Sequence, residues 1–322
     1  MNNEINNTRD TIVKIKVLGA GGGGTNAVNR MICDEVQNVD FIVVDTNAVS
    51  VSSSLAKNII QIGENEAQGI GAGANPEVGE KSAQENLEEI RSQLINTDLL
   101  FLTAGMGGGT GTGALPVIAQ MAKDMGILTI GIVTKPFKFE GRTRANNAEQ
   151  GIKKLKECVN SLIVVDNDKL LKLSKEEITM LNAFKQADNV LQQGIVGITN
   201  MLTSVGEINI DFADIRTILG ERGQAYLGIG SACGEDALSL ATHKAIENPL
   251  TTVNINGAKG VIFNVQGSKN LSLAEINSSA SIINDIVDDE ANIIFGTVIN
   301  EELGDNVIVT VIATGVNDGE KR

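Results

Sequence analysis

The sequence predicts an α/β protein built on a doubly wound parallel sheet. Short apolar runs rich in β-branched residues alternate with segments of helical period through the first half of the chain. Within each run, apolar and polar residues do not alternate, which is typical of strands buried on both faces under helices. The expected strands are residues 12–18, 41–44, 58–62, 99–102, 127–133 and 162–165.

A long central helix and a second, smaller α/β domain are expected after this sheet. Between residues 170 and 205, apolar residues recur at steps of three and four, the period of an amphipathic helix, as at Leu181 and Phe184. Asp188 interrupts this stripe in register between Phe184 and Leu191. Further strands are expected near residues 225–229, 260–265, 292–299 and 306–313, with helices near 235–247 and 273–287. The predicted organisation is a flexible N-terminus (1–10), the sheet domain (11–170), the central helix (171–205), the second domain (206–314) and a tail (315–322).

Size and composition narrow the classes of function. A chain of 322 residues and 33.9 kDa exceeds the usual size of a single core, which favours two domains. The net charge of -14 repels phosphate backbones and argues against sequence-independent binding of nucleic acid. The three cysteines form no C-x-x-C pair, and there is neither a signal-peptide core nor an apolar run of membrane-spanning length. We therefore expect a cytoplasmic protein that is not inserted in a membrane.

Glycine-rich loops supply the strongest functional signal. Residues 107–113 read Gly-Gly-Gly-Thr-Gly-Thr-Gly between an apolar run and a helical segment, so backbone N–H groups and a helix N-terminus can approach an anion there. A second cluster, residues 19–24, follows the first strand, and a third glycine-containing loop spans residues 69–79. Because the carboxyl ends of parallel strands share one edge of a sheet, we expect these loops to meet at one phosphate-binding crevice.

Two nucleotide classes remain open on this evidence. Residues 19–24 satisfy G-x-G-x-x-G, and Asp45 ends the next strand, as in dinucleotide-binding folds. More than one glycine loop favours a triphosphate, however, because a dinucleotide site uses one pyrophosphate loop. The P-loop motif is absent, since Glu80 interrupts the near match at residues 79–82. The loops would then need a counter-ion, for which Mg²⁺ bridging the phosphates is expected and a monovalent cation is the alternative.

These residues together are similar to the tubulin/FtsZ family of GTPases over residues 14–314. The matching segments are residues 21–26, 69–79, 107–113, 135–137, 139–141 and 209–214. The resemblance implies that the protein binds GTP and GDP, hydrolyses GTP, and polymerises with itself at the mid-cell ring of dividing bacteria. It implies phosphate contacts at Gly22, Gly23, Gly24, Thr25, Asn26, Gly109, Thr110 and Gly111, γ-phosphate contacts at Ala72 and Gly73, ribose contacts at Glu140 and Arg144, and a guanine contact at Asp188.

The chemistry of Asp188 suits a guanine contact. A carboxylate accepts hydrogen bonds from guanine N1–H and the exocyclic amine together, whereas adenine presents an acceptor at N1 and is repelled. Phe184 lies one helical turn earlier on the same face, where it can stack on the base. The alternative is that Asp188 is a solvated charge on the exposed side of the helix.

The candidate catalytic residues are Asn209, Asp211 and Asp214, which follow the long helix. Asp188 and Gly206 are about 27 Å apart along a helix, longer than an extended nucleoside triphosphate. This favours a role at the nucleotide of a neighbouring chain, and the resemblance implies the same arrangement. Such a head-to-tail contact does not close and generates a filament. Alternatively, Asp211 and Asp214 cap the helix expected near Ile215.

Three functions therefore compete. They are a polymerising GTPase, a nicotinamide-dependent oxidoreductase and a nucleotide-sensing filament protein without turnover. Family members usually continue into a flexible linker and a terminal peptide that docks membrane tethers and division regulators, whereas this sequence stops at Arg322. Either the chain is trimmed or that docking is missing, so partner binding through the tail is not carried over.

Overall fold

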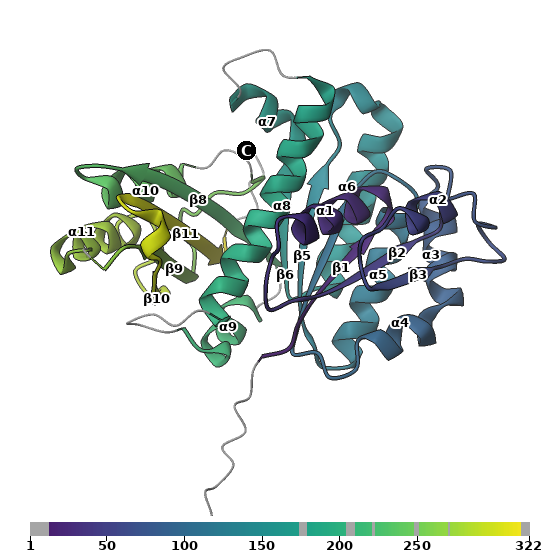
Figure 1. Cartoon of the computed structure of the whole chain (residues 1–322), viewed down its shortest axis with the longest axis horizontal. Coiled ribbons are helices and arrows are strands. Elements are labelled where there is room, and N and C mark those ends of the chain that lie inside the picture. The colour runs from purple at the N-terminus through teal and green to yellow at the C-terminus, as the bar shows by residue number, and fades with distance from the viewer. Residues whose placement is uncertain are drawn as a thin grey trace, which may run out of the picture.

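Two sheets lie on either side of one long helix. The structure, a computed structural model, describes residues 13–173, 179–203, 210–220, 223–247, 251–269 and 271–316. Helix α8 (Met180–Thr203) runs between a seven-stranded sheet and a four-stranded sheet (Figure 1). This confirms the predicted fold class.

The larger sheet is entirely parallel, with strand order β3-β2-β1-β4-β5-β6-β7. Its direction of winding reverses between β1 and β4, which places a switch point there. The six expected strands are all present, and the two-residue β7 was not predicted, because Gly223 and Gln224 carry no apolar pattern. The strands are β1 (Ile15–Ala20), β2 (Asp40–Asp45), β3 (Asn58–Gln61), β4 (Leu99–Gly105), β5 (Leu128–Lys135), β6 (Ser161–Asp166) and β7 (Gly223–Gln224).

Helices cover both faces of this sheet, which is why its strands read as unbroken apolar runs. One face packs against α3 (Pro76–Glu85), α4 (Leu87–Gln93), α5 (Thr110–Asp124) and α6 (Arg142–Cys158). The other face packs against α1 (Gly21–Cys33), α8 and α9 (Phe212–Leu219). The shorter helices are α2 (Ala48–Ser52), the 3-10 helix η1 (Lys138–Glu140) and α7 (Asn167–Leu173).

The helical pattern over residues 170–205 corresponds to two helices, α7 and α8, with residues 174–178 outside the described part of the chain. The predicted apolar stripe is wrong at its start, because the side chain of Leu181 is 65% exposed. The α8 residues of the core begin at Leu191 and continue to Met201, while the small residues Ala183 and Ala187 are buried nearer the N-terminus. The first turns of α8 thus contribute no large side chain to this core cluster.

The smaller sheet has the order β10-β9-β11-β8, in which β9 and β10 are parallel and β11 is antiparallel to both of its neighbours. One face carries its own core with α10 and α11, and Ile262 and Ile312 belong to the core shared with α8. The predicted strands and helices are confirmed as β8 (Tyr226–Cys233), α10 (Ala237–Ile246), β9 (Gly260–Gly267), α11 (Leu273–Asn284), β10 (Asn292–Ile299) and β11 (Asn306–Thr314), with η2 at Glu301–Leu303.

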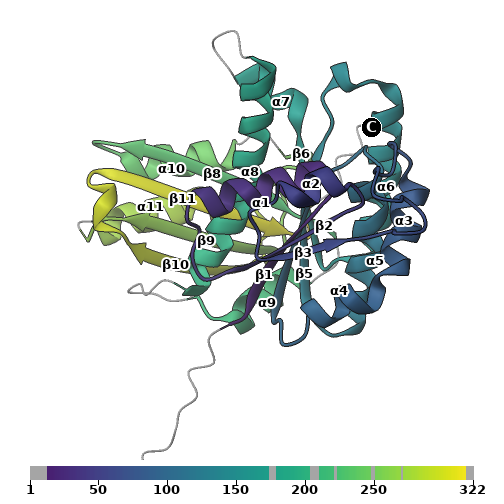
Figure 2. The ribbon, with the colours of Figure 1, turned by 45° about the vertical axis from the view of Figure 1, so that its right-hand side comes forward.

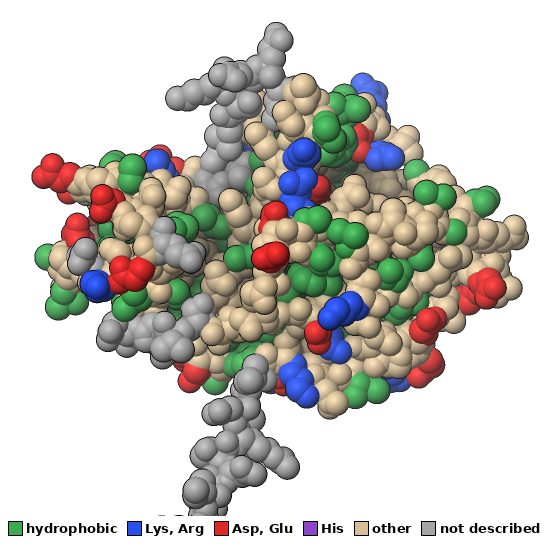
Figure 3. All heavy atoms as spheres, in the orientation of Figure 1, with side chains coloured by type: hydrophobic (Ala, Val, Ile, Leu, Met, Phe, Trp, Pro, Cys, Tyr) green, Lys and Arg blue, Asp and Glu red, His purple; other side chains and the backbone are tan. Residues whose placement is uncertain are grey.

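The surface carries mixed charge. On the face drawn in Figure 3, basic side chains are interspersed with acidic, hydrophobic and other residues and form no extended basic stripe among the described residues. Among the described helices, none combines the length and apolar character needed to cross a lipid bilayer.

Phe101, in the middle of the large sheet, tests how far the buried strands determine stability. Its side chain is fully buried in β4, so Phe101→Ala removes a ring that nothing nearby can replace. We expect the free energy of unfolding to fall by about 3–5 kcal/mol, measured by urea denaturation. Ile95→Ala, at a side chain that is 56% exposed, is the control and should change it by no more than about 0.5 kcal/mol. Equal effects of the two substitutions would contradict this packing.

Candidate functional site

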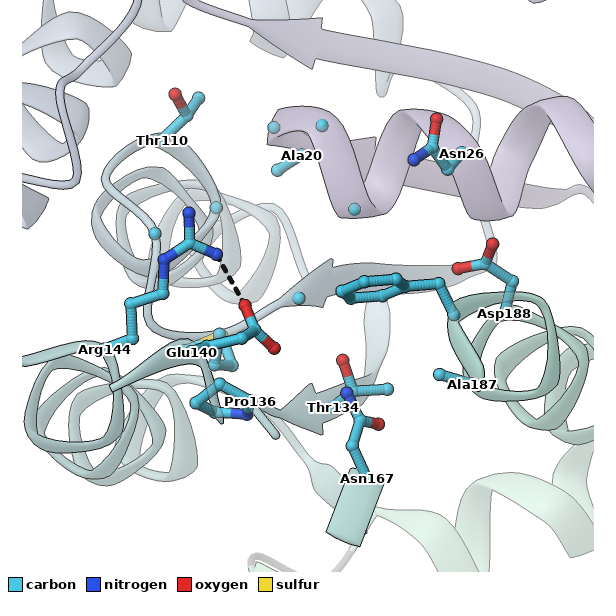
Figure 4. A pocket seen from close by; sticks show the side chains of 18 of the residues that line it. Ala20, Asn26, Thr110, Thr134, Pro136, Glu140, Arg144, Asn167, Ala187 and Asp188 are labelled. Carbon is cyan, nitrogen blue, oxygen red and sulfur yellow. Dashed lines mark hydrogen bonds and ion pairs between the residues drawn. The ribbon is translucent and has the colours of Figure 1, made fainter. Parts of the chain in front are cut away.

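A cavity of about 340 Å³ lies at the carboxyl edge of the large sheet, beside the switch point. In Figure 4, Thr110 and Arg144 lie on one side of it and Asp188 on the other, with Asn26 on α1 close to Asp188. Elements far apart in the sequence thus line one space. The remaining lining residues are Ala20, Gly21, Gly22, Gly23, Gly105, Met106, Gly108, Gly109, Gly111, Thr134, Pro136, Glu140, Asn167, Phe184, Ala187 and Leu191.

The first glycine loop lets α1 start in contact with the sheet. Gly21 has φ +68°, and a Cβ on it would lie 3.0 Å from the backbone nitrogen of Gly111. A Cβ on Gly23 would lie 2.8 Å from the backbone nitrogen of Gly105. Gly22, in contrast, has open space where a Cβ would be, and it faces the cavity. The start of α1 therefore points its unpaired N–H groups at the cavity.

The second glycine loop holds the start of α5 in the same way. The backbone N–H of Gly107 donates to Thr112 Oγ1 at 2.8 Å, which fixes the loop against the first turn of the helix. The hydroxyls of Thr110 and Thr46 share a hydrogen bond of 2.6 Å, which ties that turn to the end of β2. Two helix N-termini, those of α1 and α5, thus converge on one point and make it attractive to an anion.

A smaller cavity of about 250 Å³ adjoins this point and shares Gly22, Gly108, Gly109, Thr110 and Arg144 with the first. The predicted residues Ala72 and Gly73 line it, and the Asn147 side chain donates to the carbonyl of the neighbouring Ala74 at 3.0 Å. Their loop is thereby held over the helix termini.

Asp45 lines the smaller cavity rather than the end where Asp188 lies. Its side chain is buried, and Oδ2 has no hydrogen-bond partner among the described residues. Burial raises the pKa of this carboxyl, while the backbone N–H groups of Asn47 and Thr46 act in the opposite direction. Asp45 thus lies at the end of β2 beside the helix termini, and it is absent from the residues that line the larger cavity.

Asp188 and an aromatic cluster form the opposite end of the larger cavity. Burial raises the pKa of Asp188 to about 6, and the Arg30 guanidinium, whose Nε lies 3.9 Å from Oδ2, counteracts part of that rise. Phe184 packs edge-on against Phe137, with ring centroids 5.3 Å apart, and remains 38% exposed. A flat ring placed here would find a carboxylate at its edge and a phenyl ring beside it.

Glu140 and Arg144 form one unit on the wall of the cavity. Arg144 Nη1 donates to Glu140 Oε2 at 2.6 Å, the contact drawn as a dashed line in Figure 4. The other oxygen of Glu140 accepts the backbone N–H of Phe137 at 2.9 Å. Both predicted ribose residues therefore face the cavity, and the pair is held by its own loop.

Two predicted phosphate residues do not line either cavity. A Cβ on Gly24 would lie 2.6 Å from the carbonyl oxygen of Thr103, so this glycine serves the packing of α1 on β4. Thr25 is buried, and its hydroxyl has no hydrogen-bond partner within the described residues. Both residues are buried near the start of α1 and are absent from the residues that line the two cavities.

Asn167 lines the larger cavity and was not predicted. Its side chain is buried, and Oδ1 lacks a hydrogen-bond partner in the described part of the chain. Its position in the sequence could have indicated this, because Asn167 directly follows β6 and so lies at the same edge of the sheet as the glycine loops. Thr134 and Pro136 follow the same rule at the end of β5.

The predicted catalytic acids lie away from both cavities. Asp211 and Asp214 belong to the start of α9, which lies at the opposite end of α8 from α7 in both ribbon views (Figures 1 and 2). Asp211 Oδ1 accepts the backbone N–H of Asp214 at 2.8 Å, which confirms for Asp211 the helix cap considered as the alternative, whereas Asp214 enters this contact through its backbone alone. Asn209 lies outside the described residues.

Taken together, this geometry suits a nucleotide. Two helix N-termini and backbone N–H groups at one end accept phosphates, and a carboxylate beside an aromatic ring at the other end accepts a purine with adjacent N–H donors. All of the described residues predicted for this ligand, apart from Gly24 and Thr25, line one of the two adjoining cavities.

Comparison with known proteins agrees with this interpretation. Residues 14–175 match the model of the Tubulin/FtsZ family, GTPase domain, and residues 223–317 match that of the FtsZ family, C-terminal domain. A structure of an FtsZ dimer from M. jannaschii is 36% identical with a TM-score of 0.89, over 95% of this chain and 89% of that one. A mutant of FtsZ from M. jannaschii is 37% identical with a TM-score of 0.89, over 95% of this chain and 92% of that one.

A more distant relative shares the fold. CetZ2 from Haloferax volcanii, in a GTPγS-bound protofilament, is 20% identical with a TM-score of 0.83, over 96% of this chain and 95% of that one. The match to a GTPase domain weighs against the nicotinamide-dependent oxidoreductase. The chain belongs to the tubulin/FtsZ family of GTPases.

Proposed function

We propose that this protein polymerises head to tail and hydrolyses GTP at the junction between subunits. The base of the nucleotide lies against Asp188 and Phe184, and its phosphates lie at the N-termini of α1 and α5. Asn209, Asp211 and Asp214 of the next subunit complete the reaction centre by orienting the attacking water. GTP then favours the junction, and its hydrolysis weakens it.

The observation that carries this proposal is the separation of the acids from the cavity. Neither Asp211 nor Asp214 lines either cavity, and both lie beyond the end of a helix of 24 residues, about 36 Å long. The second half of α8 is clamped between the two sheets, so it cannot bring the two groups together by bending. We infer that the acids of a neighbouring chain complete the nucleotide site.

The relatives support the same assembly. The M. jannaschii FtsZ structure is described as a dimer, and the Haloferax volcanii CetZ2 structure as a protofilament. A contact between unlike surfaces repeats without closing, which gives a filament. We further propose that the filament acts in the cytoplasm, at the mid-cell division ring. Division regulators and membrane tethers of the family are the further partners that we propose for this ring.

Magnesium fits the phosphate end of the site as a counter-ion held mainly by phosphate and water. Within the described residues, no group of three or more His, Cys, Asp or Glu side chains is placed to hold a metal ion. Asp45 is the acidic residue among those lining the smaller cavity, and its unpartnered Oδ2 is a hard oxygen of the kind Mg²⁺ prefers. Bound there, Mg²⁺ would offset the charge of the phosphates.

Asp188→Asn tests the assignment of the base. An amide replaces one of the two hydrogen-bond acceptors of the carboxylate by a donor, which faces the N–H groups of guanine. We expect GDP to bind at least about 100-fold more weakly, because hydrogen bonds to a charged group contribute about 1.5–3 kcal/mol each. Xanthosine diphosphate, which carries a carbonyl in place of the amine, should bind more tightly to the variant than to the wild type.

Affinities for both nucleotides are measured by equilibrium dialysis on the same preparations. Lys185→Gln, which changes a charge one turn of α8 away, is the control and should leave both affinities within about twofold. Unchanged GDP affinity in Asp188→Asn would remove this residue from base recognition.

Mixing two inactive variants tests hydrolysis at the junction. Asp188→Asn keeps its acids and loses its nucleotide, whereas Asp214→Asn keeps its nucleotide and loses an acid. Each variant alone should release phosphate from GTP at a rate on the order of 100-fold below wild type or slower. An equal mixture should recover up to about one quarter of wild-type activity, because one of the four possible ordered junctions between neighbours is then complete.

Phosphate release is measured alongside sedimentation, at protein concentrations below and above the onset of assembly. A mixture no more active than its components would contradict completion of the site by a neighbour. Filaments of wild-type protein that persist with GTP and release no phosphate would instead support the alternative, a nucleotide-sensing filament protein without turnover.

A further inference from the structure

A polar ladder joins α1 to α8 behind the base end of the cavity. Arg30 of α1 faces Asp188 of α8, with 3.9 Å between Arg30 Nε and Asp188 Oδ2. Four residues further along the chain in each case, Gln192 Nε2 of α8 donates to Oδ2 of Asp34, the residue that caps the end of α1, at 2.9 Å. The matched steps show that the two helices run in the same direction and present one polar row each. Asp188 is the rung that reaches the cavity.

The first rung is an incomplete ion pair. The side chains of Arg30 and Asp188 are only 26% and 17% exposed, so water does little to screen their charges. A distance of 3.9 Å is too long for a hydrogen bond, and Arg30 Nε has no hydrogen-bond partner within the described part of the chain. Arg30 therefore acts on Asp188 through its charge and leaves the carboxylate oxygens free for other donors.

Other charges near the base end do not substitute for Arg30. From η1 and α6, Glu140 and Arg144 also line the cavity, but they pair with each other at 2.6 Å. Burial is the largest influence on the pKa of Asp188, and Arg30 supplies the opposing electrostatic influence. With the pKa held at about 6, the carboxylate is mostly ionised at neutral pH.

Recognition of guanine needs this ionised form. A neutral carboxyl group carries a proton on one oxygen, and it cannot accept from N1–H and the exocyclic amine together. We propose that Arg30 is a specificity-determining residue of the nucleotide site, which keeps the Asp188 carboxylate charged and doubly accepting toward guanine. The inference rests on the proposed function, since it takes Asp188 as the group that contacts the base.

Arg30→Gln removes the charge and keeps a polar side chain. Loss of a cation about 4 Å away raises a carboxyl pKa by about one unit or more, so GDP binding should weaken about fivefold at pH 6 relative to wild type and less than about twofold at pH 8.5. Arg30→Lys retains a cation and should restore most of the affinity at pH 6. Affinity for GDP is measured by equilibrium dialysis from pH 5.5 to 8.5.

Gln192→Ala is the matched control, because it breaks the second rung of the ladder without changing the charge beside Asp188. It should leave the pH dependence of GDP binding at its wild-type position. If Arg30→Gln weakens binding equally at every pH, or behaves like Gln192→Ala, its role is structural and the inference is wrong. Failure of the base assignment itself would appear separately, as unchanged GDP affinity in Asp188→Asn.

Discussion

The close approach of two helix starts to the ends of β1 and β4 is the constraint on which the rest of the site depends. Gly23 lies against the backbone of Gly105, and a Cβ on Gly111 would lie 2.9 Å from the carbonyl oxygen of Ala20. No larger residue fits at such contacts without moving a strand or a helix. The glycines are thus required by packing first, and the convergence of N–H groups on one point follows from it.

The positive potential at the starts of α1 and α5 comes from backbone N–H groups, and few basic side chains among the described residues line the cavities there. Arg144 is the basic residue that lines both cavities, and its charge is shared with Glu140 at 2.6 Å. Asp45 adds a buried carboxyl whose pKa is raised by that burial. Backbone dipoles are therefore the main positive feature of this end of the cavities, and a metal ion bound with the nucleotide, as proposed above, would add a second one.

Long buried strands and one misplaced charge were the features that the sequence predicted best. The strands were predictable because short apolar runs without alternation are typical of a sheet covered on both faces. Strand β7 has only Gly223 and Gln224 and is defined by its pairing with β6. Asp188 stood out as a carboxylate on an apolar stripe. Leu181 was misassigned because periodicity does not reveal where the sheet beneath a helix ends.

Residues that act through position alone were harder to predict. Asn167 carries no motif, and its role in the cavity depends on the turn that follows β6. Arg30 is an ordinary basic residue near the end of α1 until α8 is placed beside it. Conversely, Gly24 and Thr25 belong to a motif, yet Gly24 packs against β4 and Thr25 is buried away from both cavities, because successive residues of a helix point in different directions.

Helix α8 links the two ends of the proposed reaction centre. Its first half presents Asp188 to the cavity, while its second half is packed between Ile132 of the large sheet and Ile262 of the small one. Because α8 is held along this half, it sets the position of Asp211 and Asp214 relative to Asp188 of the same subunit. Any displacement of α8 along its axis would therefore change the base contact and the position of the acids together. In the head-to-tail filament proposed above these would belong to two different junctions, so the occupancy of one nucleotide site would be mechanically connected to the geometry of the next.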